Sequence, residues 1–523
     1  MKKDADASAL SPRELLRFVW TQLTSMRTAL TLLFVAALAA IPGSLIPQRP
    51  VSPVQVTNFI EDNPTLGRAY DALGLFEVYT SPWFSAIYLL LLVSLLGCII
   101  PRIGVYAKAV RAQPVQTPRN LGRLPAYAKI PARDDAIEAA EAHLKGRHFR
   151  VRRIDEPNAT SLSAERGYLR EAGNLVFHLS LVVLLIGVAI GVLFGYRGTS
   201  IVPVGGGFAN TLSQYDELTS GAEFTDLDLD PFSVVIDDFV ARFETGPVNT
   251  GQPLDFIAFA RVTDRPGEPE REETITVNHP LEIGGAQVHL LGHGYAPRVT
   301  VHDGNGDVAF SGPVVFLPQD GSFTSNGVIK APDARPDRLA FEGIFVPTAP
   351  VDSPMPQSLF PDPFNPELFL NAFHGPPREA TGVPENVYSL NKDDLTQYLA
   401  EDGDLLRFRL KPGEEFALPD GRGTISFEGW QRWVRLQVSY TPGLPLALGS
   451  VLVGVAGLCL SLFIRPRRLW VRVRADGTAE VAGLDRAEGR TGLAESVGEL
   501  GEAVLLTDPV LENDPGRSSG MAG

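Results

Sequence analysis

One histidine lies inside a run of residues that is apolar enough to cross a membrane. The run Leu175–Phe194 contains twenty residues without a formal charge, about enough for one helix through the hydrocarbon core. Its only titratable side chain is His178, and an ionisable residue in such a helix is by default a functional candidate. A neutral imidazole there can ligate haem iron, relay protons or hydrogen-bond a neighbouring helix. The residues alone leave these three roles open.

The other histidines form weaker patterns. His279 lies in Asn278-His279-Pro280, ten residues before His289, and the glycines at 284 and 285 offer a turn between them. His279 is therefore a secondary candidate for cofactor binding. No carboxylate accompanies these residues at metal-site spacing, so no metal is predicted beyond haem iron. Five others are interpreted as structural or surface residues: His143, His148, His289, His293 and His302.

Several kinds of chemistry are excluded. The two cysteines, Cys98 and Cys459, both lie in apolar runs, which excludes a disulfide framework, a CxxC redox pair and a cysteine zinc site. The glycines 205–207 lack the Lys-Ser/Thr of a phosphate loop, and no GxSxG or HExxH occurs, so no catalytic residue is assigned. A net charge of −15 argues against nucleic-acid binding as the main activity.

Four apolar runs qualify as membrane spans, and the basic residues that flank them predict their orientation. Lys and Arg are concentrated after the second and fourth runs, whereas the loop between the first two contains only Arg49 and Arg68. By the positive-inside rule both termini and the loop 102–172 are cytoplasmic. The first run could instead be a secretory signal, because Ala37, Ala39 and Ala40 are small, but the segment before it is longer than usual.

The expected organisation is a multi-pass protein of the bacterial cell membrane with a large extracytoplasmic domain. In chain order the predicted segments are a cytoplasmic arm (1–27), TM1 (28–47), an external loop (48–82), TM2 (83–101), a basic cytoplasmic loop domain (102–172), TM3 (173–195), an extracytoplasmic domain (196–442), TM4 (443–464) and a cytoplasmic tail (465–523) with a disordered end. The tail is expected to be mobile from Asp476 onward, because it is poor in aromatic residues.

The fold class follows from the residue patterns. The extracytoplasmic domain contains many alternating runs of strand length, which predicts an antiparallel sandwich or a barrel-like sheet. Its segment 347–384 is rich in proline and is expected to be an irregular insertion, and 391–399 to form a short helix. The cytoplasmic loop predicts a small α/β domain with strands at 126–130 and 148–154 around a helix at 134–145. The expected strands of the outer domain are 232–236, 255–261, 273–277, 286–291, 298–301, 312–317, 339–346, 423–428 and 434–438.

The third span has small residues on one side and the histidine on another. Gly187, Gly191 and Gly195 recur every four residues, a pattern that lets another helix approach closely. His178 precedes Gly187 by nine residues, which is half a turn at about 100° per residue. We therefore expect the glycines to pack on a helix and His178 to face elsewhere.

Several of these pieces together resemble the ResB/CcsB family. They are Arg27-Thr28-Ala29, residues 42–48 (PGSLIPQ), 74–84, 173–180 (GNLVFHLS), 278–281, 294–297 (GYAP) and 436–443 (LQVSYTPG). The resemblance covers residues 12–475 and includes the order of the spans. Each piece is weak alone, and the combination is specific.

The resemblance implies a function in cytochrome c synthesis by the machinery called system II. Such a protein is a subunit that acts with a multi-span ResC/CcsA-type partner, and the two move haem outward and attach it to apocytochrome c. Haem b would be a transient substrate, and the family's axial-ligand histidine matches His178. The tryptophan-rich motif of the pair belongs to the partner, so whether this chain by itself counts as a haem lyase stays open. With no thiol pair of its own, it would depend on separate thiol-disulfide proteins.

Two other classes of function are alternatives. The first is a non-catalytic membrane scaffold or chaperone, whose outer domain binds apocytochrome or the partner without contacting haem. The second is a solute transporter, which is disfavoured because the spans contain few polar groups and no inverted repeat.

Overall fold

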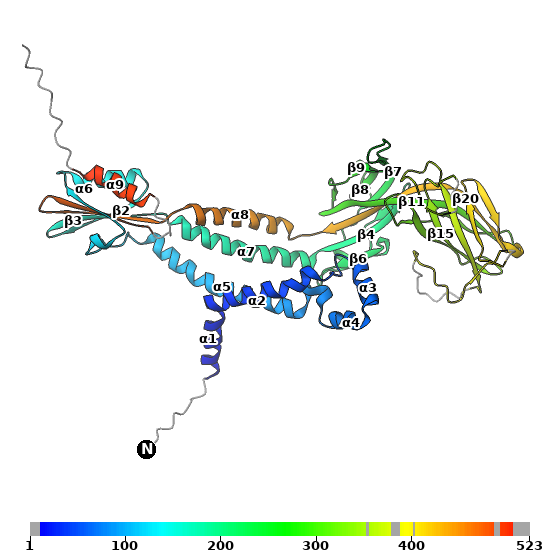
Figure 1. Cartoon of the computed structure of the whole chain (residues 1–523), viewed down its shortest axis with the longest axis horizontal. Coiled ribbons are helices and arrows are strands. Elements are labelled where there is room, and N and C mark those ends of the chain that lie inside the picture. Colours follow the sequence, from blue (N-terminus) through cyan, green and yellow to red (C-terminus); the bar gives the residue numbers. More distant parts are fainter. Residues whose placement is uncertain (1–10, 352–354, 378–386, 401–402, 486–491, 506–523) are drawn as a thin grey trace, which may run out of the picture. The chain divides into compact units, whose positions relative to one another are not determined.

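The computed structural model describes residues 11–351, 355–377, 387–400, 403–485 and 492–505 (Figure 1). These residues form two compact units. The first comprises Met1–Ile186 and Pro445–Gly523, and the second comprises Gly187–Leu444. The division falls within the third and at the start of the fourth apolar helix.

Four helices are long and apolar enough to cross a membrane, as predicted. They are α2 (Met26–Leu45), α5 (Pro82–Arg111), α7 (Leu169–Phe194) and α8 (Leu444–Phe463). The predicted bounds hold to within a few residues, except that α5 continues ten residues beyond the expected end at 101. The helix continues through Pro101, although an interior proline removes one hydrogen bond and crowds the preceding turn. Lys108 and Arg111 in its last turn stabilise the carboxyl end of the helix dipole.

Shorter elements surround these helices in the first unit. The N-terminal arm forms α1 (Pro12–Leu23), where the Ser11 hydroxyl and the Glu14 carboxylate form a capping box. Between α2 and α5 lie α3 (Pro53–Asp62), α4 (Pro64–Ala72) and the 3₁₀ helix η1 (Leu75–Thr80). Leu16 and Trp20 of α1 are more than half exposed, as an amphipathic helix against a membrane surface requires.

The α/β part of the first unit is a five-stranded antiparallel sheet. The predicted strand, helix and strand are β1 (Ala126–Pro131), α6 (Ala136–Gly146) and β2 (Arg150–Glu156). The sheet also contains β3 (Ala159–Arg166), β21 (Arg467–Arg474) and β22 (Thr478–Asp485), in the order β1-β22-β21-β3-β2. Helices α6 and α9 (Leu493–Val504) pack on one face (Figure 1) and close a core that includes Leu144, Leu162, Val471, Val481 and Leu500.

The expectation of a mobile tail from Asp476 onward is therefore wrong for β22 and α9. Val481 is fully buried between β1 and β21, and Leu500 is fully buried against the sheet. These few apolar residues become a strand and a helix because the earlier loop supplies a sheet for them to cover. The end of the tail, 506–523, lies outside the described residues.

The second unit is mostly β, as predicted, and its strands form three antiparallel sheets. The first sheet comprises β4 (Tyr196–Pro203), β6 (Glu217–Ser220), β10 (Leu281–Ile283), β11 (Ala286–Asp303), β12 (Val308–Pro313), β19 (Glu414–Ala417) and β20 (Gly423–Tyr440). The second comprises β5 (Gly207–Ala209), β7 (Ser233–Phe243), β8 (Pro253–Thr263) and β9 (Arg271–Thr276). The third comprises β13 (Leu317–Pro318), β14 (Ser325–Ala331), β15 (Arg338–Val346), β16 (Glu367–Gly375), β17 (Thr396–Gln397) and β18 (Arg407–Leu410).

Two long strands hold these sheets together. Strands β11 and β20 each have 18 residues and pair along almost their whole length. One half of the pair buries Val288 and Leu436 against the second sheet, and the other half buries Tyr295 and Phe427 against the third. The domain is therefore two sandwiches that share a central pair, and none of its sheets closes into a barrel.

Three expectations about the second unit are wrong in detail. The runs 286–291 and 298–301 are one strand, and so are 423–428 and 434–438, because β-bulges at 290/292 and 298/299 interrupt the alternation without ending the pairing. The supposed irregular insertion contains β16, which pairs with β15 over nine residues and buries Leu368, Leu370 and Ala372 in the core. Instead of a helix, 391–399 forms irregular chain and β17, because Lys392 and Tyr398 contact the third sheet.

Candidate functional site

His178 lies on α7, and its ring is fixed by a single hydrogen bond. Nδ1 is 2.7 Å from the backbone carbonyl oxygen of Asn174, one turn earlier. A carbonyl oxygen can only accept, so Nδ1 carries a proton, and in the neutral ring the lone pair is then on Nε2. The half-buried ring also makes an edge contact with Phe177 at 5.2 Å between centroids. The described residues offer no hydrogen-bond partner to Nε2.

The opposite side of α7 packs against α8 through backbone contacts. A Cβ atom added at Gly457 would lie 2.8 Å from both the Gly173 carbonyl oxygen and the Phe177 amide nitrogen. Farther along α8, a Cβ atom at Gly454 would lie 2.5 Å from the Ser180 hydroxyl. Within the second unit, a Cβ atom at Gly443 would overlap the Gly187 carbonyl oxygen. His178 is about half a turn from Ser180 and Gly187, so it faces away from this contact, as predicted. The glycines expected to pack on a helix meet the segment just before α8 instead, with Gly187 against Gly443 and Gly191 against Thr441.

Replacing Gly457 by leucine is expected to separate α7 from α8. No side chain fits there, because even its first carbon would lie 2.8 Å from backbone atoms of α7, and overpacking of this kind costs about 1–3 kcal/mol or more. We expect the variant to lose thermal stability in detergent, measured by size-exclusion chromatography after heating. Gly449→Leu is the matched control, since nothing lies within 4 Å of that position on the same helix. Equal loss in both variants would contradict the packing described here.

The sequence left three roles open for His178: haem ligand, proton relay or hydrogen bond to a neighbouring helix. Its geometry fits the ligand role. A histidine that binds a metal through one nitrogen usually donates its other N–H to a carbonyl or carboxylate, which fixes the tautomer and the ring orientation. The Asn174 carbonyl does this for His178. The ligand role of His178 stays a prediction, and it is the one for which the ring is already oriented.

The other predicted candidate, His279, has a different setting. It is exposed in the turn after β9, where its backbone exchanges hydrogen bonds with Thr276, and it follows Asn278, which has a positive φ of 68°. Its backbone is thus fixed while its side chain points to solvent. In the part of the chain that the structure describes, no three His, Cys, Asp or Glu side chains group as a metal site. The structure does not add to the weak ligand prediction for His279.

His293 has the most unusual environment of any histidine in the second unit. It is 6% exposed, and neither ring nitrogen has a hydrogen-bond partner among the described residues. Four phenylalanine rings surround it, with Phe323 stacked at 4.6 Å, Phe256 at 4.6 Å, Phe239 at 5.0 Å and Phe243 at 6.1 Å. Burial, with a smaller effect of the Arg432 charge, lowers the pKa of His293 to about 3. The imidazole is therefore neutral in the folded domain.

Arg432 completes this buried polar cluster. Its guanidinium pairs with Asp362 at 2.6 Å and lies 5.0 Å from the centre of the Tyr295 ring, while Nη1 has no hydrogen-bond partner among the described residues. The sequence analysis placed His293 only among structural or surface residues. No local pattern could have shown its burial, because the surrounding rings come from β7, β8 and the loop before β14.

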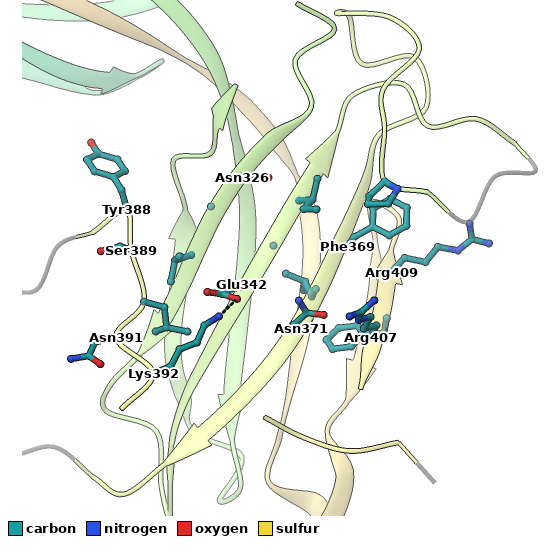
Figure 2. Close-up of a pocket in the computed structure, with 18 of the residues that line it drawn as sticks. Asn326, Glu342, Phe369, Asn371, Tyr388, Ser389, Asn391, Lys392, Arg407 and Arg409 are labelled. Carbon is teal, nitrogen blue, oxygen red and sulfur yellow. Dashed lines mark ion pairs between the residues drawn. The ribbon is translucent and has the colours of Figure 1, made fainter. Parts of the chain in front are cut away.

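An open groove covers the outer face of the third sheet (Figure 2). Its volume is about 1470 Å³, larger than the roughly 300–1,000 Å³ of most small-molecule sites. Lys392 lies over the sheet and pairs with Glu342 at 2.8 Å. By register, two rows of side chains cross the sheet and end in arginines: Asn326, Ile344, Phe369 and Arg409, and Val328, Glu342, Asn371 and Arg407. The groove therefore offers polar, apolar and basic side chains along one face of the sheet.

Comparison with known proteins gives one consistent result. The model of the ResB-like family matches residues 26–496. Cytochrome c biogenesis protein CcsB of Thermosynechococcus vestitus is 27% identical over 288 residues, which are 54% of this chain and 61% of the relative. The protein of the same name from Synechococcus sp. strain WH7803 is 29% identical over 307 residues, which are 57% of this chain and 64% of the relative. The chain thus matches somewhat less than two thirds of these relatives' length.

Proposed function

This chain belongs to the ResB-like family, and on that premise we propose that it is the haem-handling subunit of a system II cytochrome c synthase. In this role it acts with a ResC/CcsA-type membrane protein, carries haem outward and presents it to apocytochrome c. The observation that carries the proposal is His178, an imidazole within an apolar helix whose Nδ1–H is fixed and whose Nε2 is unengaged by the described residues.

The proposed orientation places the sheet of the first unit in the cytoplasm and the β domain outside. The flanking basic residues favour this arrangement. Strand pairing supports a shared side for two of the segments, because β3 pairs with β21 and β1 pairs with β22. The loop after α5 and the segment after α8 must therefore lie on the same side of the membrane. An even number of crossings, α7 and α8, separates the two segments.

The chain contains only two cysteines, and they do not form a redox pair. A protein without a thiol pair would act as one subunit of the proposed machinery and would not itself reduce apocytochrome. Cys98 lies in α5, where its thiol donates to the Thr24 carbonyl at 3.0 Å, and Cys459 lies in α8. Reduction of the apocytochrome thiols would thus come from separate thiol-disulfide proteins. The haem b would be cargo, ligated through iron by His178 and held until it is transferred.

A second candidate function is favoured by the groove on the third sheet. A scaffold that holds apocytochrome or the partner without contacting haem needs a surface for polypeptide, and this groove offers one with apolar and basic side chains. The scaffold and the haem-handling subunit differ in whether the purified complex contains haem.

The two candidates are separated by one experiment. In a bacterium that lacks its own ResB-type gene, we expect this chain with its ResC/CcsA-type partner to restore covalent haem on c-type cytochromes, detected by haem staining of a denaturing gel. The purified complex is expected to show a Soret band. Restored cytochromes without such a band would favour the scaffold, and failure of restoration would contradict both.

A further inference from the structure

Two arginines face each other at the end of the sheet that leads into the membrane helices. Strand β3 ends at Arg166, three residues before α7, and β21 begins at Arg467, four residues after α8. In the antiparallel register Arg166 lies directly opposite Arg467. Like charges at such positions destabilise a sheet unless other groups compensate them.

A carboxylate balances the charge of the neighbouring Arg468, whereas none in the described part of the chain pairs with Arg166. The neighbouring Arg468 pairs with Glu165 at 2.8 Å. Arg467, which is 7% exposed, bonds to Ser496 and approaches Asp485 at 3.6 Å. Arg166, in contrast, forms no ion pair or hydrogen bond through its side chain with the described residues.

The guanidinium of Arg166 is held by an aromatic ring instead. It lies 4.7 Å above the centre of the Phe149 ring. Burial and then the positive charges of Arg467 and Arg147 lower the pKa of Arg166, although Asp485 and Glu499 act in the opposite direction. Arg147 itself pairs with Glu499 at 2.6 Å. The anions near the cluster thus pair with Arg147 and Arg467, and the Arg166 guanidinium has no ion-pair partner among the described residues.

A small pocket opens between these side chains. Its polar lining consists of the donors His143, Arg147, Arg166 and Ser496 and of the Glu499 carboxylate, which pairs with Arg147. The volume of about 10 Å³ holds no more than about one water molecule, so a larger anion would bind at the mouth. The guanidinium groups could meet it there with paired N–H donors, the geometry that suits phosphate oxygens.

The short distance between the arginines and the end of α8 indicates that such an anion would come from the lipid headgroups. At about 3.3 Å per residue, the four residues from the end of α8 to Arg467 extend at most about 13 Å, which is within reach of the lipid headgroups. We propose that Arg166, with Arg147 beside it, binds the phosphate of an anionic phospholipid headgroup at this end of α7 and α8. The site would anchor the sheet to the lipid surface and neutralise the facing arginines.

Lipid retention by the full chain tests this site without reference to haem. The protein is purified in mild detergent, supplied with phosphatidylglycerol or phosphatidylcholine, and examined by native mass spectrometry. We expect a phosphatidylglycerol adduct that Arg166→Gln weakens by about tenfold or more, while Arg166→Lys keeps part of it. Arg474→Gln, at the far end of β21, is the matched control and should retain the adduct.

Three results would overturn the proposal. One is an adduct that Arg166→Gln leaves unchanged in a protein that still elutes as a folded monodisperse species. A second is equal retention of phosphatidylcholine. Displacement of the lipid by millimolar inorganic phosphate, with equal thermal protection by phosphate alone, would assign the site to free phosphate rather than lipid and would also contradict it.

Discussion

The variant His178→Gln is expected to lose the Soret band of the purified complex and to stop cytochrome c maturation. Glutamine has a similar length and can still hydrogen-bond within the helix, but it does not ligate haem iron as imidazole does. Groups that only orient a metal ligand contribute about 10–100-fold to affinity, and removing the ligand itself should have at least that effect. Haem per complex and haem staining of cytochromes measure the two consequences.

The controls for this experiment come from histidines elsewhere in the chain. His143→Gln, in the α/β sheet domain, should leave both signals unchanged, and so should His279→Gln in the exposed turn after β9. A loss in His279→Gln would revive the weaker ligand candidate. Normal cytochromes in His178→Gln would rule out the ligand role and leave only the scaffold.

Acidification is expected to destabilise the β domain. The largest single contribution to this loss of folding free energy should come from the protonation of His293. Its pKa is about 3 in the folded protein, against the ordinary value of 6.5. Between these values the unfolded chain binds a proton that the folded one excludes, so stability falls as the pH is lowered from 6.5 toward 3. Each pH unit in this window changes the free energy of unfolding by about 1.4 kcal/mol. The full change is therefore on the order of 5 kcal/mol.

The test compares two leucine variants on one strand. In His293→Leu the pH dependence between 6.5 and 4 should become shallower, and stability at neutral pH should be equal or higher, because two unpaired buried nitrogens are removed. His289→Leu, on the same strand and partly exposed, should keep the wild-type slope. Tryptophan fluorescence during denaturant unfolding of the full chain follows the domain, since Trp433 is buried beside Tyr295. An unchanged slope in His293→Leu would contradict the burial described here.

Much of the architecture could be predicted because its causes are local. A membrane helix is an apolar run of sufficient length, so four spans and the position of His178 follow directly from residue type. The half-turn between His178 and Gly187 follows from helix geometry alone. The alternation of apolar residues likewise predicted a large β domain, although bulges in β11 divided one strand into two apparent ones.

Other features could not be predicted because they join distant parts of the chain. Residues 478–485 are too short an apolar pattern to indicate a strand, and β22 forms only because β1 and β21 flank it. The same holds for β16, whose flanking prolines indicated an irregular loop while its pairing with β15 decided otherwise.

The sequence by itself thus determined which residues are apolar enough to enter a membrane, which regions are rich in strands and which histidine lies within an apolar helix. These properties depend on neighbours within a few turns or a few alternations. Only the tertiary structure decided that β22 joins the first sheet, that His293 is enclosed by four phenylalanines and that Arg166 faces Arg467. Each of these depends on hydrogen bonding, burial or strand register, which arise when the folded chain brings particular atoms together and which residue type alone does not specify.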